Sequence, residues 1–117
     1  MSDTPASKES VDLADRMAEL GQRYLARTAT DIEELRTQIA RLSEGDPNAL
    51  KNIEMNAHRI RGSGAMFGFE LLSDVSGEIE MLAADAKLGL QLDRSALQTR
   101  FSALLRVLAF VLGAARQ

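Results

Sequence analysis

His58 is the only histidine in a chain of 117 residues that contains no cysteine. A neutral imidazole is a good nucleophile and proton acceptor near neutral pH, so this side chain is the first candidate for chemistry. The apolar residues around it, among them Ile53, Ala57 and Ile60, are three or four positions apart. This spacing predicts a helix with His58 on the solvent side. A lone exposed histidine is usually without function, so the case for a role of His58 depends on the residues around it.

Two glycines follow His58 inside the same predicted helix. Each costs about 1 kcal/mol relative to alanine in a helix interior. A side chain at position 62 would lean back over position 58, so Gly62 leaves the imidazole open to a partner. Gly64 falls on the buried face, where a missing side chain lets a neighbouring helix approach closely. The alternative, that both glycines only permit tight packing, explains Gly64 better than Gly62.

The helix that precedes this region is predicted from about residue 10 to residue 42. Its apolar positions begin at Leu13, but their phase slips between Tyr24 and Ile32. Thr30 and Glu33 form a Thr-x-x-Glu capping box in this interval, which allows a break there. We therefore expect four or five helices in all.

Three further helices are delimited by capping and breaking residues. Asp46 as N-cap and Pro47 at the first helical position begin the helix of His58, and Gly68 ends it. The next helix stops near Gly89, and Asp93 caps the last. The apolar positions expected in the core are Leu50, Ile53, Ala57, Ile60, Gly64, Phe67, Leu72, Val75, Ile79, Leu82, Ala86, Leu97, Phe101, Leu104, Leu108 and Val111.

No stretch alternates with a period of two, so the predicted fold class is all-α. Four amphipathic helices with short connections pack most simply as an antiparallel up-down four-helix bundle, here with an additional N-terminal helical segment. Residues 10–117 are expected to form this one domain. Residues 1–9 are polar and are expected to be a disordered tail.

Composition excludes several classes of protein. The net charge of −3 argues against nucleic acid as the main partner. With one histidine, no cysteine and no Glu-x-x-His pair, a metal-binding bundle is disfavoured. The apolar run of residues 104–113 is interrupted by Arg106 and is shorter than the roughly 20 residues a membrane span requires. We therefore expect a cytoplasmic protein with no membrane contact and no cofactor.

The segment of residues 57–68, AHRIRGSGAMFG, resembles the signature of the histidine-containing phosphotransfer (HPt) domain family. The signature has His, any residue, an aliphatic residue, Lys or Arg, Gly, two small residues, and a Gly ten positions after the His. The resemblance implies that His58 is the phosphoacceptor, that Arg61 adds positive charge near the phosphoryl group, and that Gly62 opens access. It extends loosely over residues from about 18 to 112.

Glu80 lies 22 residues after the histidine, where many family members have Gln and the phosphoacceptor domains of chemotaxis kinases have Glu. It also falls at the edge of the apolar stripe of its own helix, so it can lean towards the helix of His58. A carboxylate that accepts a hydrogen bond from Nδ1–H would leave Nε2 as the nucleophile. The alternative is an ordinary solvated glutamate, and Lys51 and Lys87 are interpreted as ordinary surface charges.

The resemblance implies a phosphocarrier and not an enzyme with its own turnover. Its expected partners are the receiver domains of hybrid histidine kinases and response regulators, which would supply Mg²⁺, and a monomer is expected. Two alternatives stay open. One is the phosphoacceptor domain of a chemotaxis-like histidine kinase, and the other is a helical adaptor bundle that is never phosphorylated.

Overall fold

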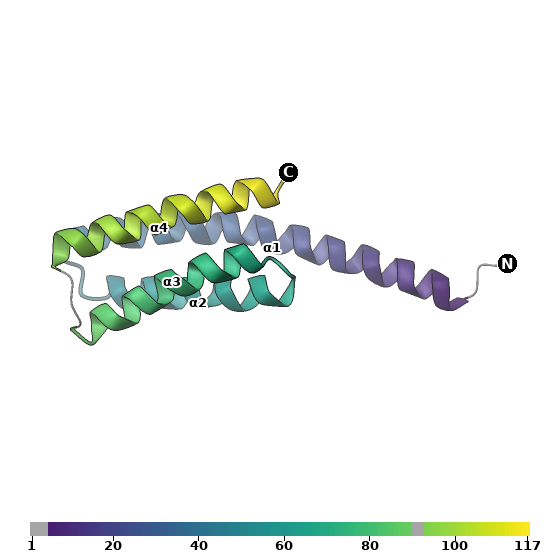
Figure 1. Cartoon of the computed structure of the whole chain (residues 1–117), viewed down its shortest axis with the longest axis horizontal. Helices are drawn as coiled ribbons and strands as arrows, with labels where there is room; N and C mark the ends of the chain where they lie inside the picture. The colour runs from purple at the N-terminus through teal and green to yellow at the C-terminus, as the bar shows by residue number, and fades with distance from the viewer. Residues whose placement is uncertain (1–4, 90–92) are drawn as a thin grey trace.

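The computed structural model describes residues 5–89 and 93–117, and all regular structure in these residues is helical. The four helices are α1 (Pro5–Ser43), α2 (Ala49–Met66), α3 (Glu70–Lys87) and α4 (Arg94–Ala115). They run up and down in turn, and the N-terminal part of α1 extends beyond the other three (Figure 1). The predicted all-α four-helix bundle is therefore confirmed.

The first helix is longer and more regular than the sequence suggested. It is continuous from Pro5 to Ser43, so the break allowed near Thr30 is absent. The apolar phase slips there because the buried Thr28 occupies a core position, with its hydroxyl donating to the Tyr24 carbonyl at 2.8 Å. The additional N-terminal segment is thus the first part of α1 itself.

The expected boundary of the N-terminal tail is also wrong in part, because residues 5–9 are helical. Pro5 starts α1, and proline is compatible with the first turn of a helix, where its missing N–H has no intrahelical partner. Residues 1–4 of the expected tail lie outside the described residues.

Capping residues set most of the other helix ends as expected. The Asp93 side chain accepts from the Ala96 amide at 2.8 Å and caps α4. Gly68 and Gly89 have φ of 81° and 76°, which terminates α2 and α3. The start of α2 differs from the prediction, because the helix begins at Ala49. The Asp46 carboxylate accepts a hydrogen bond from the Asn48 amide in a turn before the helix, so it does not cap α2.

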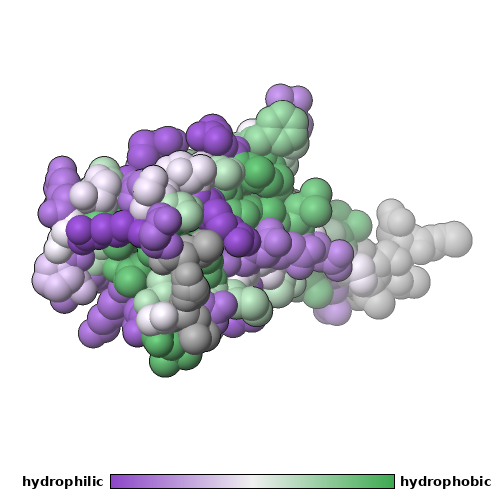
Figure 2. All heavy atoms as spheres, turned by 60° about the vertical axis from the view of Figure 1, so that its left-hand side comes forward, coloured by the Kyte–Doolittle hydropathy of each residue, from purple (hydrophilic) through white to green (hydrophobic). Residues whose placement is uncertain are grey.

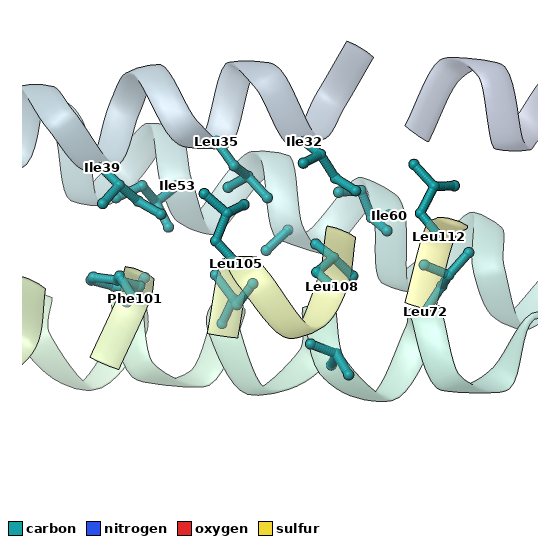
Figure 3. Close-up of a cluster of buried hydrophobic side chains, with 14 of the residues drawn as sticks. Ile32, Leu35, Ile39, Ile53, Ile60, Leu72, Phe101, Leu105, Leu108 and Leu112 are labelled. Carbon is teal, nitrogen blue, oxygen red and sulfur yellow. The ribbon is translucent and has the colours of Figure 1, made fainter. Parts of the chain in front are cut away.

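Each helix packs against two others, so that the core runs along the axis of the bundle (Figure 3). On α4 the buried positions are partly different from the expected ones, because Leu105 and Leu112 face the core whereas Leu104 and Val111 are only partly buried. Among the described helices α4 alone is long and apolar enough to cross a membrane by length and composition. Its buried face is part of the core. The fully or nearly buried apolar residues are Tyr24, Leu25, Ile32, Leu35, Ile39, Leu42, Ala49, Ile53, Ala57, Ile60, Leu72, Val75, Ile79, Ala83, Leu97, Phe101, Leu105, Leu108 and Leu112.

Gly64 lies where α2 packs closely against α1 and the start of α3. A Cβ at this position would lie 2.8 Å from the Tyr24 hydroxyl oxygen and 3.3 Å from backbone atoms of Phe69 and Ser73. The Tyr24 hydroxyl is held in place because it donates to the Ile60 carbonyl at 3.0 Å. By contrast, a Cβ at Gly62 would meet nothing within 4 Å.

For these two glycines we predict opposite effects of substitution by alanine on the free energy of unfolding. Gly62→Ala should raise the free energy of unfolding by up to about 1 kcal/mol, because it improves helix propensity in open space. Gly64→Ala should lower it by about 1–3 kcal/mol, because the added methyl overpacks a buried contact. Chemical denaturation of both variants measures the difference, and equal shifts in the same direction would contradict the assignment of the two faces.

Candidate functional site

His58 lies in the middle of α2 and points away from the core. Its side chain is 61 % exposed, whereas Ala57 before it and Ile60 after it are buried. Gly62, one turn later, has open space around it, since a Cβ there would meet nothing within 4 Å. The amphipathic pattern of α2 thus presents a ring edge to solvent, as its sequence predicts.

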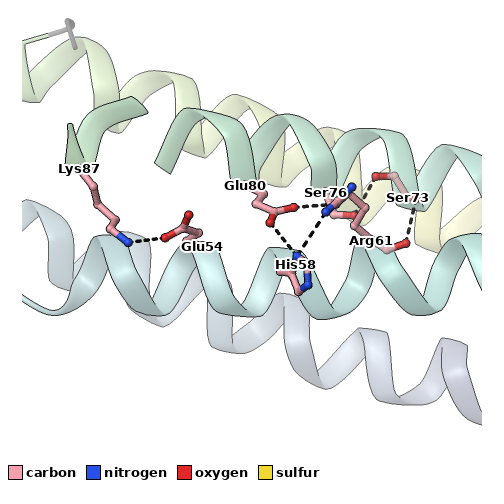
Figure 4. A network of polar contacts seen from close by, with 7 residues as sticks. All are labelled: Glu54, His58, Arg61, Ser73, Ser76, Glu80 and Lys87. Atoms are coloured by element: carbon pink, nitrogen blue, oxygen red, sulfur yellow. Dashed lines mark hydrogen bonds and ion pairs between the residues drawn. The ribbon is translucent and has the colours of Figure 1, made fainter. Parts of the chain in front are cut away.

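Glu80 on α3 reaches across to this ring (Figure 4). Its Oε2 lies 2.7 Å from His58 Nδ1, and its side chain is 20 % exposed. The contact depends on α2 and α3 lying side by side, since the two residues are 22 positions apart in the chain. The sequence-predicted pair is therefore brought together, and Glu80 is not a freely solvated glutamate.

The partners of Nδ1 determine which ring nitrogen carries the proton. An ionised carboxylate can only accept hydrogen bonds, so the 2.7 Å contact requires Nδ1–H to donate to Glu80 Oε2. The Arg61 Nη2 lies farther away, 3.3 Å from the same nitrogen, and cannot donate to it while Nδ1 is protonated. In the neutral ring Nε2 then has a free lone pair, which is the form a nucleophilic imidazole needs.

Arg61 lies beside the His58 ring and contacts Glu80 directly. Its Nε donates to Glu80 Oε1 at 2.6 Å, so the guanidinium lies on the Nδ1 side of the ring. The expectation from the family resemblance placed its charge near the group carried by the ring. In this geometry its direct partner is the carboxylate, with one oxygen of Glu80 taken by Arg61 and the other by His58 (Figure 4). Two fixed partners hold the carboxylate in one orientation.

Two residues of α3 that were not expected at the site, Ser73 and Gly77, contact Arg61. A Cβ at Gly77 would lie 3.1 Å from Arg61 Cδ, so this glycine lets the stem of the arginine side chain lie close against α3. Ser73 Oγ donates to the Arg61 carbonyl at 2.9 Å and joins the two helices. The available signal was Gly77 itself, since a glycine inside a predicted helix carries a cost that calls for a reason.

A second ion pair joins α2 and α3 one turn before the histidine. Lys87 Nζ lies 2.6 Å from Glu54 Oε1, so Lys87 is more than an isolated surface charge. Lys51 is exposed on the same side of α2 as His58. Two ion pairs between α2 and α3 therefore lie on either side of His58 along α2. Glu54 with Lys87 precedes it, and Arg61 with Glu80 follows it.

The arrangement can present one unprotonated ring nitrogen to another molecule, and it contains little else that could catalyse a reaction. In the described part of the chain, no group of three or more His, Cys, Asp or Glu side chains could hold a metal ion. The site is a shallow surface, lined around the ring by Glu54, Met55, Arg59 and Glu80. A reaction partner must therefore bring the rest of its active site with it.

In a comparison with known protein families, the Hpt domain family matches residues 19–110, a range that includes His58, Arg61, Gly62 and Glu80. No curated protein matches the chain. No solved structure matches it either.

Replacing Glu80 tests the tautomer assignment. In Glu80→Ala the ring loses its acceptor at Nδ1, so the neutral form should redistribute its proton between the two nitrogens. Nitrogen NMR of ¹⁵N-labelled imidazole reads this directly, with Glu78→Ala as the control because Glu78 is an exposed carboxylate on the same helix. An unchanged tautomer balance in Glu80→Ala would show that the hydrogen bond does not set the protonation of His58.

Proposed function

The chain belongs to the Hpt domain family, and on that premise we propose that it relays a phosphoryl group between receiver-domain aspartates through Nε2 of His58. The observation that carries this proposal is the contact of 2.7 Å between His58 Nδ1 and Glu80 on an otherwise exposed ring. It leaves the second nitrogen free, unprotonated and directed at solvent. The established family role is histidine phosphotransfer, and the receiver-to-receiver relay is our specific proposal.

The proposed transfer balances without a proton leaving the attacking nitrogen. The Nε2 lone pair attacks the phosphorus of a receiver's aspartyl phosphate, an N–P bond forms, and the P–O bond to the aspartate breaks. The aspartate leaves as a carboxylate, and the ring keeps its Nδ1 proton. The ring thereby gains positive charge, which the adjacent Glu80 carboxylate stabilises through its short hydrogen bond. The reverse sequence delivers the phosphoryl group to the next receiver.

We expect the receiver to supply the cations for phosphoryl transfer. Phosphoryl transfer is accelerated mainly by positioning and by cations that neutralise the equatorial oxygens. Arg61 is engaged by Glu80 on the opposite side of the ring, so we assign the cations to the receiver, as Mg²⁺ and a lysine near its aspartate. On this proposal the chain is a phosphocarrier in the cytoplasm, with no turnover of its own.

A second candidate is favoured by Glu80, the residue type found at this position in the phosphoacceptor domains of chemotaxis-like kinases. In that case ATP and a separate kinase domain would phosphorylate His58. Incubating the protein with a phosphorylated receiver, and separately with such a kinase and ATP, distinguishes the two. An adaptor bundle that is never phosphorylated would take up label in neither.

The acceptor is tested by replacing the ring. His58→Gln should abolish phosphoryl uptake from a phosphorylated receiver and leave the helical content nearly unchanged, because the side chain is exposed and contributes little to the core. Lys51→Gln is the control, since it introduces the same residue on the same exposed side of α2. The label should be acid-labile and alkali-stable. Undiminished labelling of His58→Gln would remove the proposal.

Gly62 tests whether access to the ring depends on an absent side chain. Gly62→Gln should remain folded, yet its side chain would lean over His58 and slow transfer from a receiver by at least about tenfold. Labelling by a small donor such as phosphoramidate should fall much less. The control is Gly113→Gln, a change at another helical glycine with open space around it but on α4. A full receiver transfer rate in Gly62→Gln would show that this glycine does not gate access.

A further inference from the structure

The N-terminal part of α1 is a helix without a bundle around it. Every residue from 8 to 20 is exposed, and this part of α1 projects away from the other helices in Figure 1. The family match begins only at residue 19, so most of this segment lies outside the matched domain. Its structure therefore needs a source of stability other than the four-helix core.

The projecting segment carries an apolar stripe that continues the core-facing side of α1. Leu13, Met17 and Leu20 are 62 %, 44 % and 41 % exposed, and the next residue of the stripe, Tyr24, is buried at 7 %. The spacing of four, three and four residues keeps all of them on one side of the helix. Figure 2 shows apolar surface on the part of the molecule that leads towards the N-terminus.

Such a stripe predicts a partner helix. A helical segment of this length is marginal in water on its own, and tertiary packing of its apolar side supplies most of the stability of a protein helix. An unpaired stripe of leucine and methionine would instead leave apolar surface in water. One flank of the stripe is formed by the small residues Ala14 and Ala18, which allow another helix to approach closely.

The charges on the other flank indicate which partner fits. Glu9, Arg16 and Arg23 lie seven residues apart on this flank. In an antiparallel pair of two such helices, with the two-fold axis near residue 16, each Glu9 lies opposite an Arg23 of the other copy. In a parallel pair the same charges would face the other flank of the partner, where Ala14 and Ala18 offer no opposite charge. Arg16, at the centre, has Asp12 and Glu19 within one turn on either side.

We infer that the projecting half of α1 is the dimerisation element of this protein, which pairs in antiparallel fashion with the same segment of a second copy. The stripe of Leu13, Met17 and Leu20 forms the seam, and the two bundles lie at opposite ends of the pair. The expectation of a monomer considered only the four-helix core, which one chain completes. Two His58 rings are then carried in one particle, and the interface uses neither of them.

The mass in solution tests this inference. Wild type should behave as a dimer of the 12.8 kDa chain at micromolar concentration in analytical ultracentrifugation. Met17→Glu places a charge in the seam and should weaken the dimer on the order of 100-fold. Gln22→Glu is the matched control, because it adds the same charge on the exposed opposite side of α1 and should leave the dimer intact.

A monomeric wild type would overturn the inference, and so would a Met17→Glu dimer as stable as that of Gln22→Glu. Uptake of label by His58 from phosphoramidate should be the same in wild type and Met17→Glu. This readout separates a failure of the dimer from a failure of the proposed phosphotransfer.

Orientation is tested with single cysteines, since the chain has none of its own. Arg16→Cys, beside the two-fold axis, should form a disulfide-linked dimer on oxidation. Glu9→Cys should not, because the two copies of position 9 would be about 20 Å apart, far beyond the roughly 7 Å that a disulfide tolerates between Cα atoms. Equal cross-linking at both positions would contradict the antiparallel arrangement.

Discussion

The geometry of the site depends on a single carboxylate shared between two helices. Glu80 accepts from His58 Nδ1 at 2.7 Å with one oxygen and from Arg61 Nε at 2.6 Å with the other. The bond to Arg61 holds the carboxylate in orientation, and the bond to His58 fixes the ring proton. An exposed imidazole, whose proton could otherwise sit on either nitrogen, is thereby given one protonated and one free nitrogen.

Glycines around this carboxylate have separate roles that follow from where they lie on their helices. Gly64 lets α2 approach Tyr24 and the start of α3, which sets the spacing that Glu80 must span. Gly77 leaves space for the Arg61 side chain to lie against α3. A Cβ at Gly62 would meet nothing within 4 Å, so packing within the molecule does not require a glycine there. On our proposal, this glycine instead leaves the ring accessible to a receiver.

The sequence was sufficient for the parts of this structure that local pattern governs. Helix periodicity and the glycines at 68 and 89 predicted the bundle. The position of Glu80 at the edge of its apolar stripe allowed a contact with His58 but left a solvated glutamate open, and the structure shows the contact. The sequence pattern was insufficient where a polar residue occupies a core position. The buried Thr28 interrupts the apolar pattern of α1, although the helix continues through it. The partner of Arg61 depends on side-chain geometry across α2 and α3, which helix periodicity does not encode. Likewise, periodicity shows that Leu13 and Met17 lie on an apolar side, but only the tertiary structure shows that the bundle ends before it covers them.

The position of the phosphoryl group on the ring tests the central claim most directly. After phosphorylation of ¹⁵N-histidine-labelled protein, phosphorus–nitrogen coupling identifies which nitrogen of His58 bears the group. We predict attachment at Nε2, with Nδ1 still protonated and bound to Glu80. Attachment at Nδ1, or a phosphorylated ring whose Nδ1 proton no longer bonds to Glu80, would contradict it.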